Sequence, residues 1–242
     1  MNEPLWLTGT DPLELLADLY PMSTLGSERP QARQSRMYLL ACARRAWGRL
    51  PGVCRALVAL AEVYTDSPGD NEWLRARLAP VAEQLIHSGG EESDVREAHH
   101  ELVHFGHISA DVELALRAAD VPPDPPLASD EWQGLVRLVY LPFVRNAPAY
   151  TWVPRGLHSC ELLREVCGNP CRFAPFPHAW RTSDAVALAR QMYDGREFSA
   201  MPILADALQD AGCDSAAVLD HCREPGDHVR GCWVVDRVLN LR

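Results

Sequence analysis

The sharpest chemical pattern in the chain pairs His100 with His104 and places Glu101 between them. On a helix, residues i and i+4 share one face, so the two imidazoles can hold one Zn²⁺ ion. The glutamate can then act on the metal-bound water as general base, which is typical of zinc-dependent hydrolases. Glu113 is the nearest candidate for a further ligand, on the helix expected to follow.

The same pattern has a simpler interpretation. The longer zinc-peptidase pattern requires a third histidine, and Ala110 occupies that position. Histidine is also locally dense, since His99 and His107 lie close by, and this makes a chance match easier. No strand is expected nearby to bind a peptide substrate. We therefore favour a polar, partly exposed helix and keep the hydrolase as an alternative.

A second group of possible metal ligands, three cysteines and two histidines, lies near the C-terminus. A helix expected to start near Asp227 would place His228 and Cys232 one turn apart on the same face. A structural zinc site is conceivable there, but the tight Cys-x-x-Cys spacing is missing. Buried cysteines in a small helical core are the favoured interpretation. The ligands of the zinc alternative are Cys213, Cys222, His228 and Cys232, with His221 beside them.

A third group of thiols and imidazoles precedes that segment. Three residues separate Cys167 from Cys171, so this pair is not a redox Cys-x-x-Cys. A Cys–His nucleophile pair stays open, because such partners meet in space rather than in sequence. The members of this group are Cys160, Cys167, Cys171, His158 and His178.

Composition excludes several classes of function. All 23 basic residues are arginine, so the chain has no phosphate-loop, kinase or Schiff-base lysine. The formal net charge of −10 indicates a poor general binder of nucleic acid, because cationic contacts to phosphate supply most of that affinity. No apolar run is long enough to span a bilayer, and no secretion signal opens the chain. We expect a cytoplasmic protein whose eight cysteines stay reduced.

Hydrophobic periodicity predicts an all-α fold, because strand-like alternation is weak throughout. Thr182 is expected to cap one helix, and Gly212 to end another in the left-handed conformation. Asp214 and Asp227 are expected to cap the two short helices that follow. The expected helices include those over about 30–50, 52–65, 91–105, 109–119, 157–166 and 182–193, and three short helices between 201 and 241.

A proline-rich stretch marks the clearest boundary in the chain. Four prolines fall within residues 121–127 and enforce an extended, semi-rigid connector. This predicts an N-terminal helical segment over 1–120, a connector over 121–129 and a C-terminal helical module over 130–242. The two segments can also pack as one body.

Two surfaces are candidates for contact with a protein partner. The expected helix over about 30–50 carries arginines on one side, although such runs are usually solvated faces that pair with carboxylates elsewhere. The second surface lies in the C-terminal module. The candidate residues are Arg33, Arg36, Arg44 and Arg45 on the first surface, and His228, Arg230 and Trp233 on the second.

Several runs of the sequence form a recognisable set. They are Trp6-Leu7, 39–47, 167–172 (Cys-Gly-Asn-Pro-Cys-Arg), 192–198, Pro-Ile-Leu-Ala-Asp-Ala-Leu at 202–208 and Gly-Cys-Trp-Val-Val-Asp at 231–236. In these runs the chain resembles a large set of uncharacterised planctomycete-type proteins, over roughly the first fifty residues and from about residue 160 onward. The resemblance implies shared lineage and a small helical module at the C-terminus, and it supplies no mechanism.

The sequence therefore favours a non-catalytic helical protein that acts as an interaction or scaffold module. It predicts a protein partner, with no cofactor, no nucleic acid and no membrane. The alternatives are the zinc hydrolase centred on Glu101 and the structural zinc site of the C-terminal module.

Overall fold

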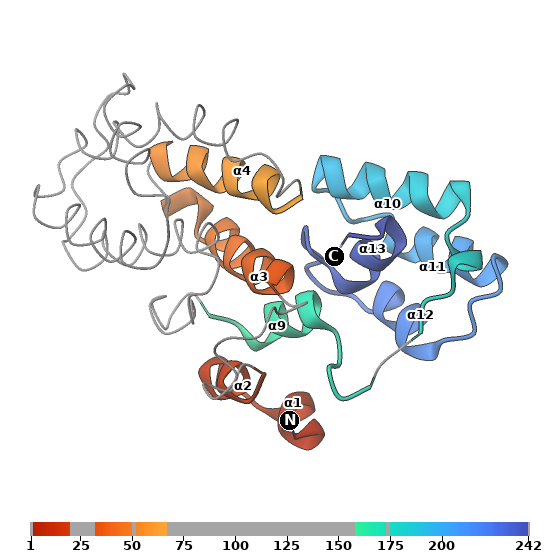
Figure 1. The fold of residues 1–242 in the computed structure, drawn as a ribbon, viewed down its shortest axis with the longest axis horizontal. Coiled ribbons are helices and arrows are strands. Elements are labelled where there is room, and N and C mark those ends of the chain that lie inside the picture. Colours follow the sequence, from red (N-terminus) through yellow and green to blue (C-terminus); the bar gives the residue numbers. More distant parts are fainter. Residues whose placement is uncertain (1, 20–31, 50–51, 67–157, 173–174, 242) are drawn as a thin grey trace, which may run out of the picture. The chain divides into compact units, whose positions relative to one another are not determined.

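The computed structural model describes residues 2–19, 32–49, 52–66, 158–172 and 175–241, and every regular element in these ranges is helical (Figure 1). The predicted all-α fold is confirmed for this part of the chain. None of its helices is long and apolar enough to cross a membrane.

The chain divides into two compact units. One unit combines residues 1–19 with 160–242, and the other comprises residues 20–159. The predicted connector at 121–129 lies outside the described residues, so the proposed segment boundary stays a prediction.

The unit of residues 20–159 contains the helices α3 (Ala32–Arg45), η2 (Trp47–Arg49) and α4 (Gly52–Asp66), and α3 packs against α4. Two arginines of the predicted contact surface form ion pairs inside this unit. Arg33 is only 5% exposed and lies 2.7 Å from the Asp66 carboxylate. Arg44 donates two hydrogen bonds to Glu62, at 2.9 and 2.8 Å.

The remaining two arginines of that surface differ in their exposure. Arg36 is half-buried and Arg45 is exposed. Binding of a protein partner to this arginine surface stays a prediction. The ion pairs of Arg33 and Arg44 fit the interpretation in which arginines pair with carboxylates of the same protein.

Four helices form the C-terminal part of the other unit: α10 (Ser183–Gly195), α11 (Met201–Asp210), α12 (Ala216–Arg223) and α13 (Trp233–Leu239). A short helix, η6 (His178–Trp180), precedes them. α11 packs against α10 and α12, and α13 packs against the same two helices. Their shared core contains Tyr193, Leu204, Leu208, Val218, Cys222, Val235 and Val238, each at most 1% exposed.

The predicted ends of these helices are partly confirmed. Thr182 caps α10 by accepting a hydrogen bond from the Ala185 N–H at 3.3 Å, and Gly212 after α11 has a φ of +86°. α12 begins after Ser215, one residue beyond the predicted cap at Asp214.

The predicted helix start at Asp227 is wrong, because α13 begins at Trp233. Gly231 has a φ of +98°, a left-handed value that glycine adopts without strain and that a continuing α-helix excludes. The Cys232 N–H donates to the Val229 carbonyl at 2.9 Å and closes a turn. His228 therefore lies in the loop between α12 and α13, and Cys232 lies at the end of that loop. The two residues do not share a helix face.

The helix α9 (Cys160–Cys167) packs against α2 and also against α13 (Figure 1). The N-terminal helices α1 (Glu3–Thr8) and α2 (Pro12–Leu19) belong to the same unit and bury Trp6, Leu15 and Leu16. Arg164 joins α9 to this N-terminal segment through two backbone carbonyls.

Candidate metal centre

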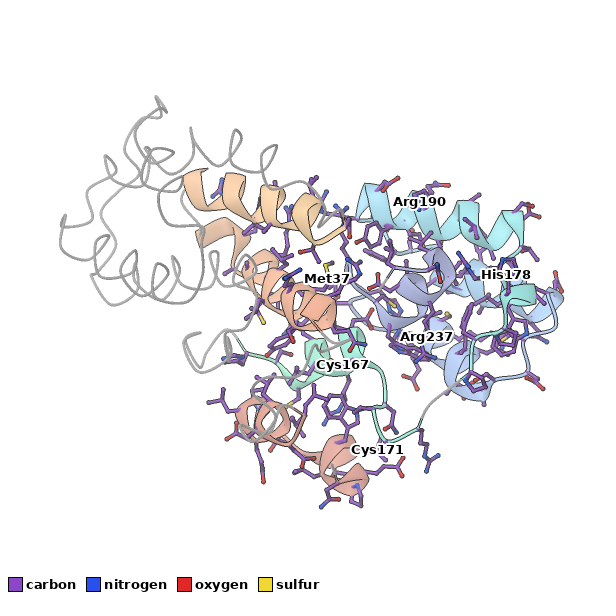
Figure 2. All side chains as sticks on the ribbon, viewed as in Figure 1. Met37, Cys167, Cys171, His178, Arg190 and Arg237 are labelled. Atoms are coloured by element: carbon purple, nitrogen blue, oxygen red, sulfur yellow. The ribbon has the colours of Figure 1, made fainter. Side chains whose placement is uncertain are left out.

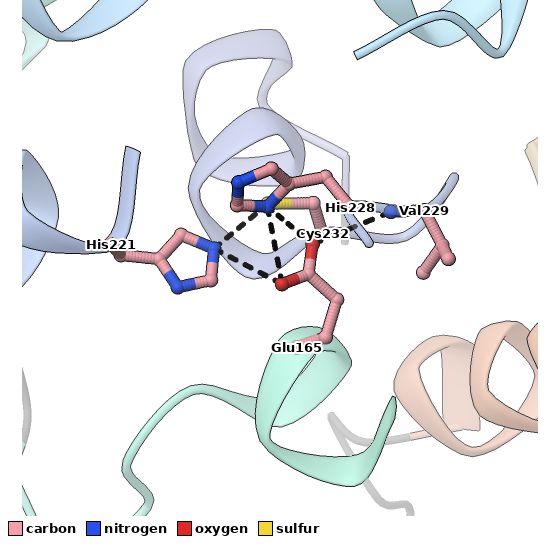
Figure 3. Close-up of polar contacts among 5 residues, drawn as sticks. All are labelled: Glu165, His221, His228, Val229 and Cys232. Atoms are coloured by element: carbon pink, nitrogen blue, oxygen red, sulfur yellow. Dashed lines mark hydrogen bonds and ion pairs between the residues drawn. The ribbon is translucent and has the colours of Figure 1, made fainter. Parts of the chain in front are cut away.

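Four side chains that can bind a metal converge in the unit of residues 1–19 and 160–242. Glu165 comes from α9, His221 from α12, His228 from the loop after α12, and Cys232 from the residue before α13 (Figure 3). One potential ligand atom from each of them lies within 4.8 Å of all the others.

Three separations among these atoms are close to those between the ligands of a small ion. His228 Nδ1 lies 3.1 Å from Glu165 Oε1, and His221 Nε2 lies 3.3 Å from Glu165 Oε2. The same Nε2 lies 3.2 Å from Cys232 Sγ. Tetrahedral zinc with bonds of about 2.0–2.3 Å places its ligand atoms about 3.3–3.6 Å apart. These three separations are close to that range, whereas the full set spans up to 4.8 Å, so the widest pairs have to close by about 1 Å around a bound ion.

The loop between α12 and α13 brings its two ligands toward α9. Its backbone contributes a further contact, since the Val229 N–H points at Glu165 Oε1 at 3.4 Å (Figure 3). Trp233 packs against the turn after α9, where a Cβ on Gly168 would lie 3.1 Å from the indole ring. Gly168 has a φ of +65°, so this close approach uses a position that favours glycine.

The electrostatics of the cluster centre on Glu165. Burial raises the pKa of this carboxyl, but the hydrogen bond from His228 and the nearby imidazole charges outweigh burial and lower it. Burial also disfavours a charged His228, yet the hydrogen bond and the charge of Glu165 raise the pKa of this imidazole. Glu165 and His228 thus stabilise each other in the ionised form.

The other two ligands favour their neutral forms. Burial lowers the pKa of His221, only partly opposed by Glu165. Burial, followed by the charge of Glu165, raises the pKa of the Cys232 thiol well above its usual range. A bound cation suits the neutral form of His221 but reverses the preference of Cys232, because a coordinating thiol loses its proton.

The geometry differs from that of a nucleophilic triad. In a triad, one imidazole nitrogen contacts the nucleophile and the other contacts the acid. Here His221 uses Nε2 for both Cys232 and Glu165. Cys232 is also fully buried, so a substrate has no access to its sulfur. The arrangement suits coordination of an ion better than covalent catalysis.

The structure brings together two of the four predicted zinc ligands, His228 and Cys232. The other two, Cys213 and Cys222, are buried but do not belong to the cluster. Burial raises the pKa of the Cys222 thiol to about 12, as suits a small hydrophobic side chain of the core. His221 and Glu165 complete the cluster in their place.

Sequence reasoning missed Glu165, although the chain carries a signal for it. α9 buries Leu162, Leu163 and Val166, and Glu165 lies on this same buried side at 9% exposure. A lone acid within the apolar side of an amphipathic helix needs a buried partner. That partner comes from a distant part of the chain, so its identity is not readable from local spacing.

The remaining candidates from the sequence lie either outside the described residues or elsewhere in the described structure. His100, Glu101, His104 and Glu113 lie outside the described residues. Cys160 and Cys167 are half-buried at the two ends of α9, and Cys171 and His178 are exposed in the turn after α9 and in η6 (Figure 2). His158 forms a hydrogen bond with the Tyr38 hydroxyl at 2.9 Å.

The predicted C-terminal contact residues participate in internal packing. The guanidinium of Arg230 lies 4.3 Å from the centre of the Tyr193 ring, and Trp233 is half-buried against Gly168. The His228 side chain is only 8% exposed within the cluster.

Comparison of the chain with protein-family models, with curated proteins and with solved structures gives no match. The resemblance to planctomycete-type proteins therefore stays a prediction.

Proposed function

We propose that this protein binds one Zn²⁺ ion through Glu165, His221, His228 and Cys232, and that the ion has a structural role. The observation that carries the proposal is the convergence of four ligand atoms within 4.8 Å of one another, two from buried residues and two from half-buried ones. They come from α9, α12 and the loop between α12 and α13, so one ion joins three segments of the unit.

The chemistry of the four side chains favours zinc over other common metals. Two imidazoles, one thiol and one carboxylate form a mixed set that suits a borderline-soft ion. Calcium and magnesium prefer oxygen ligands, and iron–sulfur clusters need more thiolates than this site offers. A thiolate and a carboxylate together also neutralise the two charges of Zn²⁺, which matters in a buried site.

The number and burial of the ligands favour a structural role. Four protein ligands fill a tetrahedral site, whereas catalytic zinc keeps a position for water or substrate. The side chains of His221, Glu165 and His228 are 17%, 10% and 8% exposed, and Cys232 is fully buried. The interaction role expected from the sequence is compatible with a metal-stabilised helical module and remains a proposal.

Elemental analysis of the untagged full-length protein tests the proposal. We expect about one zinc ion per chain in the wild type. His228→Ala and Cys232→Ser should reduce this content strongly, whereas the exposed control His178→Ala should retain it. A wild-type protein that takes up no zinc, even from added zinc salt, would contradict the proposal. Zinc lost only with His104→Ala would favour the hydrolase alternative instead.

A further inference from the structure

We infer that the metal ion also attaches α9 to the C-terminal helices α10–α13. Because the two N-terminal helices bind α9, the ion indirectly holds them in place as well. This inference rests on the proposed zinc site. It assigns to that site the control of whether the N-terminal segment is docked.

Two adjacent residues of α9 contact the two parts that the ion would join, the N-terminal helices and the C-terminal segments. Arg164 donates from Nε to the Trp6 carbonyl at 2.9 Å and from Nη2 to the Gly9 carbonyl at 2.7 Å. Glu165, the next residue, reaches the cluster formed by the C-terminal segments. Because consecutive residues of a helix point about 100° apart, one short helix can hold both partners at once.

The N-terminal helices depend on α9 and the turn that follows it. Glu3 accepts a hydrogen bond from Asn169 Nδ2 at 3.0 Å and forms an ion pair with Arg172. α2 packs directly on α9. All of these partners lie within residues 160–172, so the position of this segment determines where the N-terminal helices dock.

The attachment of α9 to the C-terminal helices differs in kind from the packing among those helices. Their core of buried residues extends from Trp180 to Leu239 and is formed without residues of α9. α9 adds packing against α13, the approach of Gly168 to Trp233, and the polar contacts of Glu165. Coordination of the Glu165 carboxylate turns these polar contacts into metal–ligand bonds.

Loss of the ion should therefore release one part of the unit and spare another. Helices α1, α2 and α9 lose their strongest link, whereas α10 and α11 keep their apolar core. The apolar side chains that α9 buries, such as Leu162 and Leu163, lie outside the core of the C-terminal helices, and segments outside such a core open locally at lower free energy. The metal thus acts as a switch for docking rather than as a requirement for the whole fold.

Hydrogen–deuterium exchange on the full-length protein tests this inference. On removal of zinc with a chelator, we expect exchange in residues 3–19 and 160–167 to accelerate about tenfold or more, with little change in α10 and α11. Glu165→Gln should behave like the chelated protein. The matched control is Glu161→Gln, which changes an exposed carboxylate of the same helix and should retain the slow exchange.

A second variant separates the two links of α9. Arg164→Met should retain zinc but accelerate exchange in residues 3–19. Stoichiometric zinc whose removal leaves exchange in residues 3–19 unchanged would overturn the inference and leave the proposed function intact. Equal acceleration in α10, α11 and the N-terminal helices would overturn it as well. A wild type that takes up no zinc would overturn both proposals.

Discussion

Glu165 and His228 lie 63 residues apart in the sequence, and the Glu165 Oε1 and His228 Nδ1 atoms meet at 3.1 Å. The pair lies where α9 meets the loop before α13, beside His221 and Cys232. A buried carboxylate is unfavourable unless charged or hydrogen-bonding partners compensate it. The four side chains supply such compensation to one another, and the same arrangement forms the candidate zinc site.

Among single substitutions of the four ligands, we expect the loss of the Cys232 thiol to weaken zinc binding most. Cys232→Ser replaces a thiolate by a weaker hydroxyl ligand of similar size, and we expect zinc affinity to fall by about 100-fold or more, above the effect of losing an outer-shell partner. Competition with a chromophoric chelator measures this change. Cys171→Ser, at an exposed thiol, is the matched control and should bind zinc as the wild type does. Equal affinities of Cys232→Ser and the wild type would exclude Cys232 as a ligand.

Substitution of cobalt for zinc should report the geometry directly. Co²⁺ in a tetrahedral site with one thiolate gives intense visible bands and a sulfur-to-metal charge-transfer band in the near ultraviolet. We expect both in the wild type, and we expect Cys232→Ser to lose the charge-transfer band while keeping visible absorption at high cobalt concentration. Weak visible bands typical of six-coordinate cobalt in the wild type would contradict a closed four-ligand site.

Metal affinity should fall as the pH falls. The pKa of Cys232 lies well above its usual range, so the thiol holds a proton that the ion must displace. His228 has a raised pKa and holds a second proton at lower pH, which strengthens the dependence. Displacement of one proton weakens binding about tenfold per pH unit, and displacement of two about 100-fold. Calorimetry in buffers of different ionisation enthalpy measures the protons released. A pH-independent affinity between neutral and weakly acidic pH would contradict coordination by Cys232 and His228.

The sequence predicted helices better than it predicted the site, because helix signals are local. Thr182 and Gly212 act within a few residues, and both predictions are confirmed. The predicted helix start at Asp227 failed because Gly231 adopts a left-handed φ that the apolar pattern does not reveal. Glu165 escaped prediction because its partners lie more than fifty positions further along the chain. Cys213 and Cys222 were offered as ligands by spacing alone, whereas the folded chain places both in apolar surroundings.

Gly168 should be sensitive to substitution because it combines a left-handed backbone with a close neighbour. Its φ is +65°, and an added Cβ would lie 3.1 Å from the Trp233 ring. We expect Gly168→Ala to lower the free energy of unfolding by about 1–3 kcal/mol, from backbone strain and overpacking together. Urea denaturation of the zinc-loaded protein measures the loss. The matched control is Gly195→Ala in α10, where a Cβ meets nothing within 4 Å, so its stability should change little. Equal stability of the two variants would show that the contact between the turn after α9 and Trp233 contributes little to the fold.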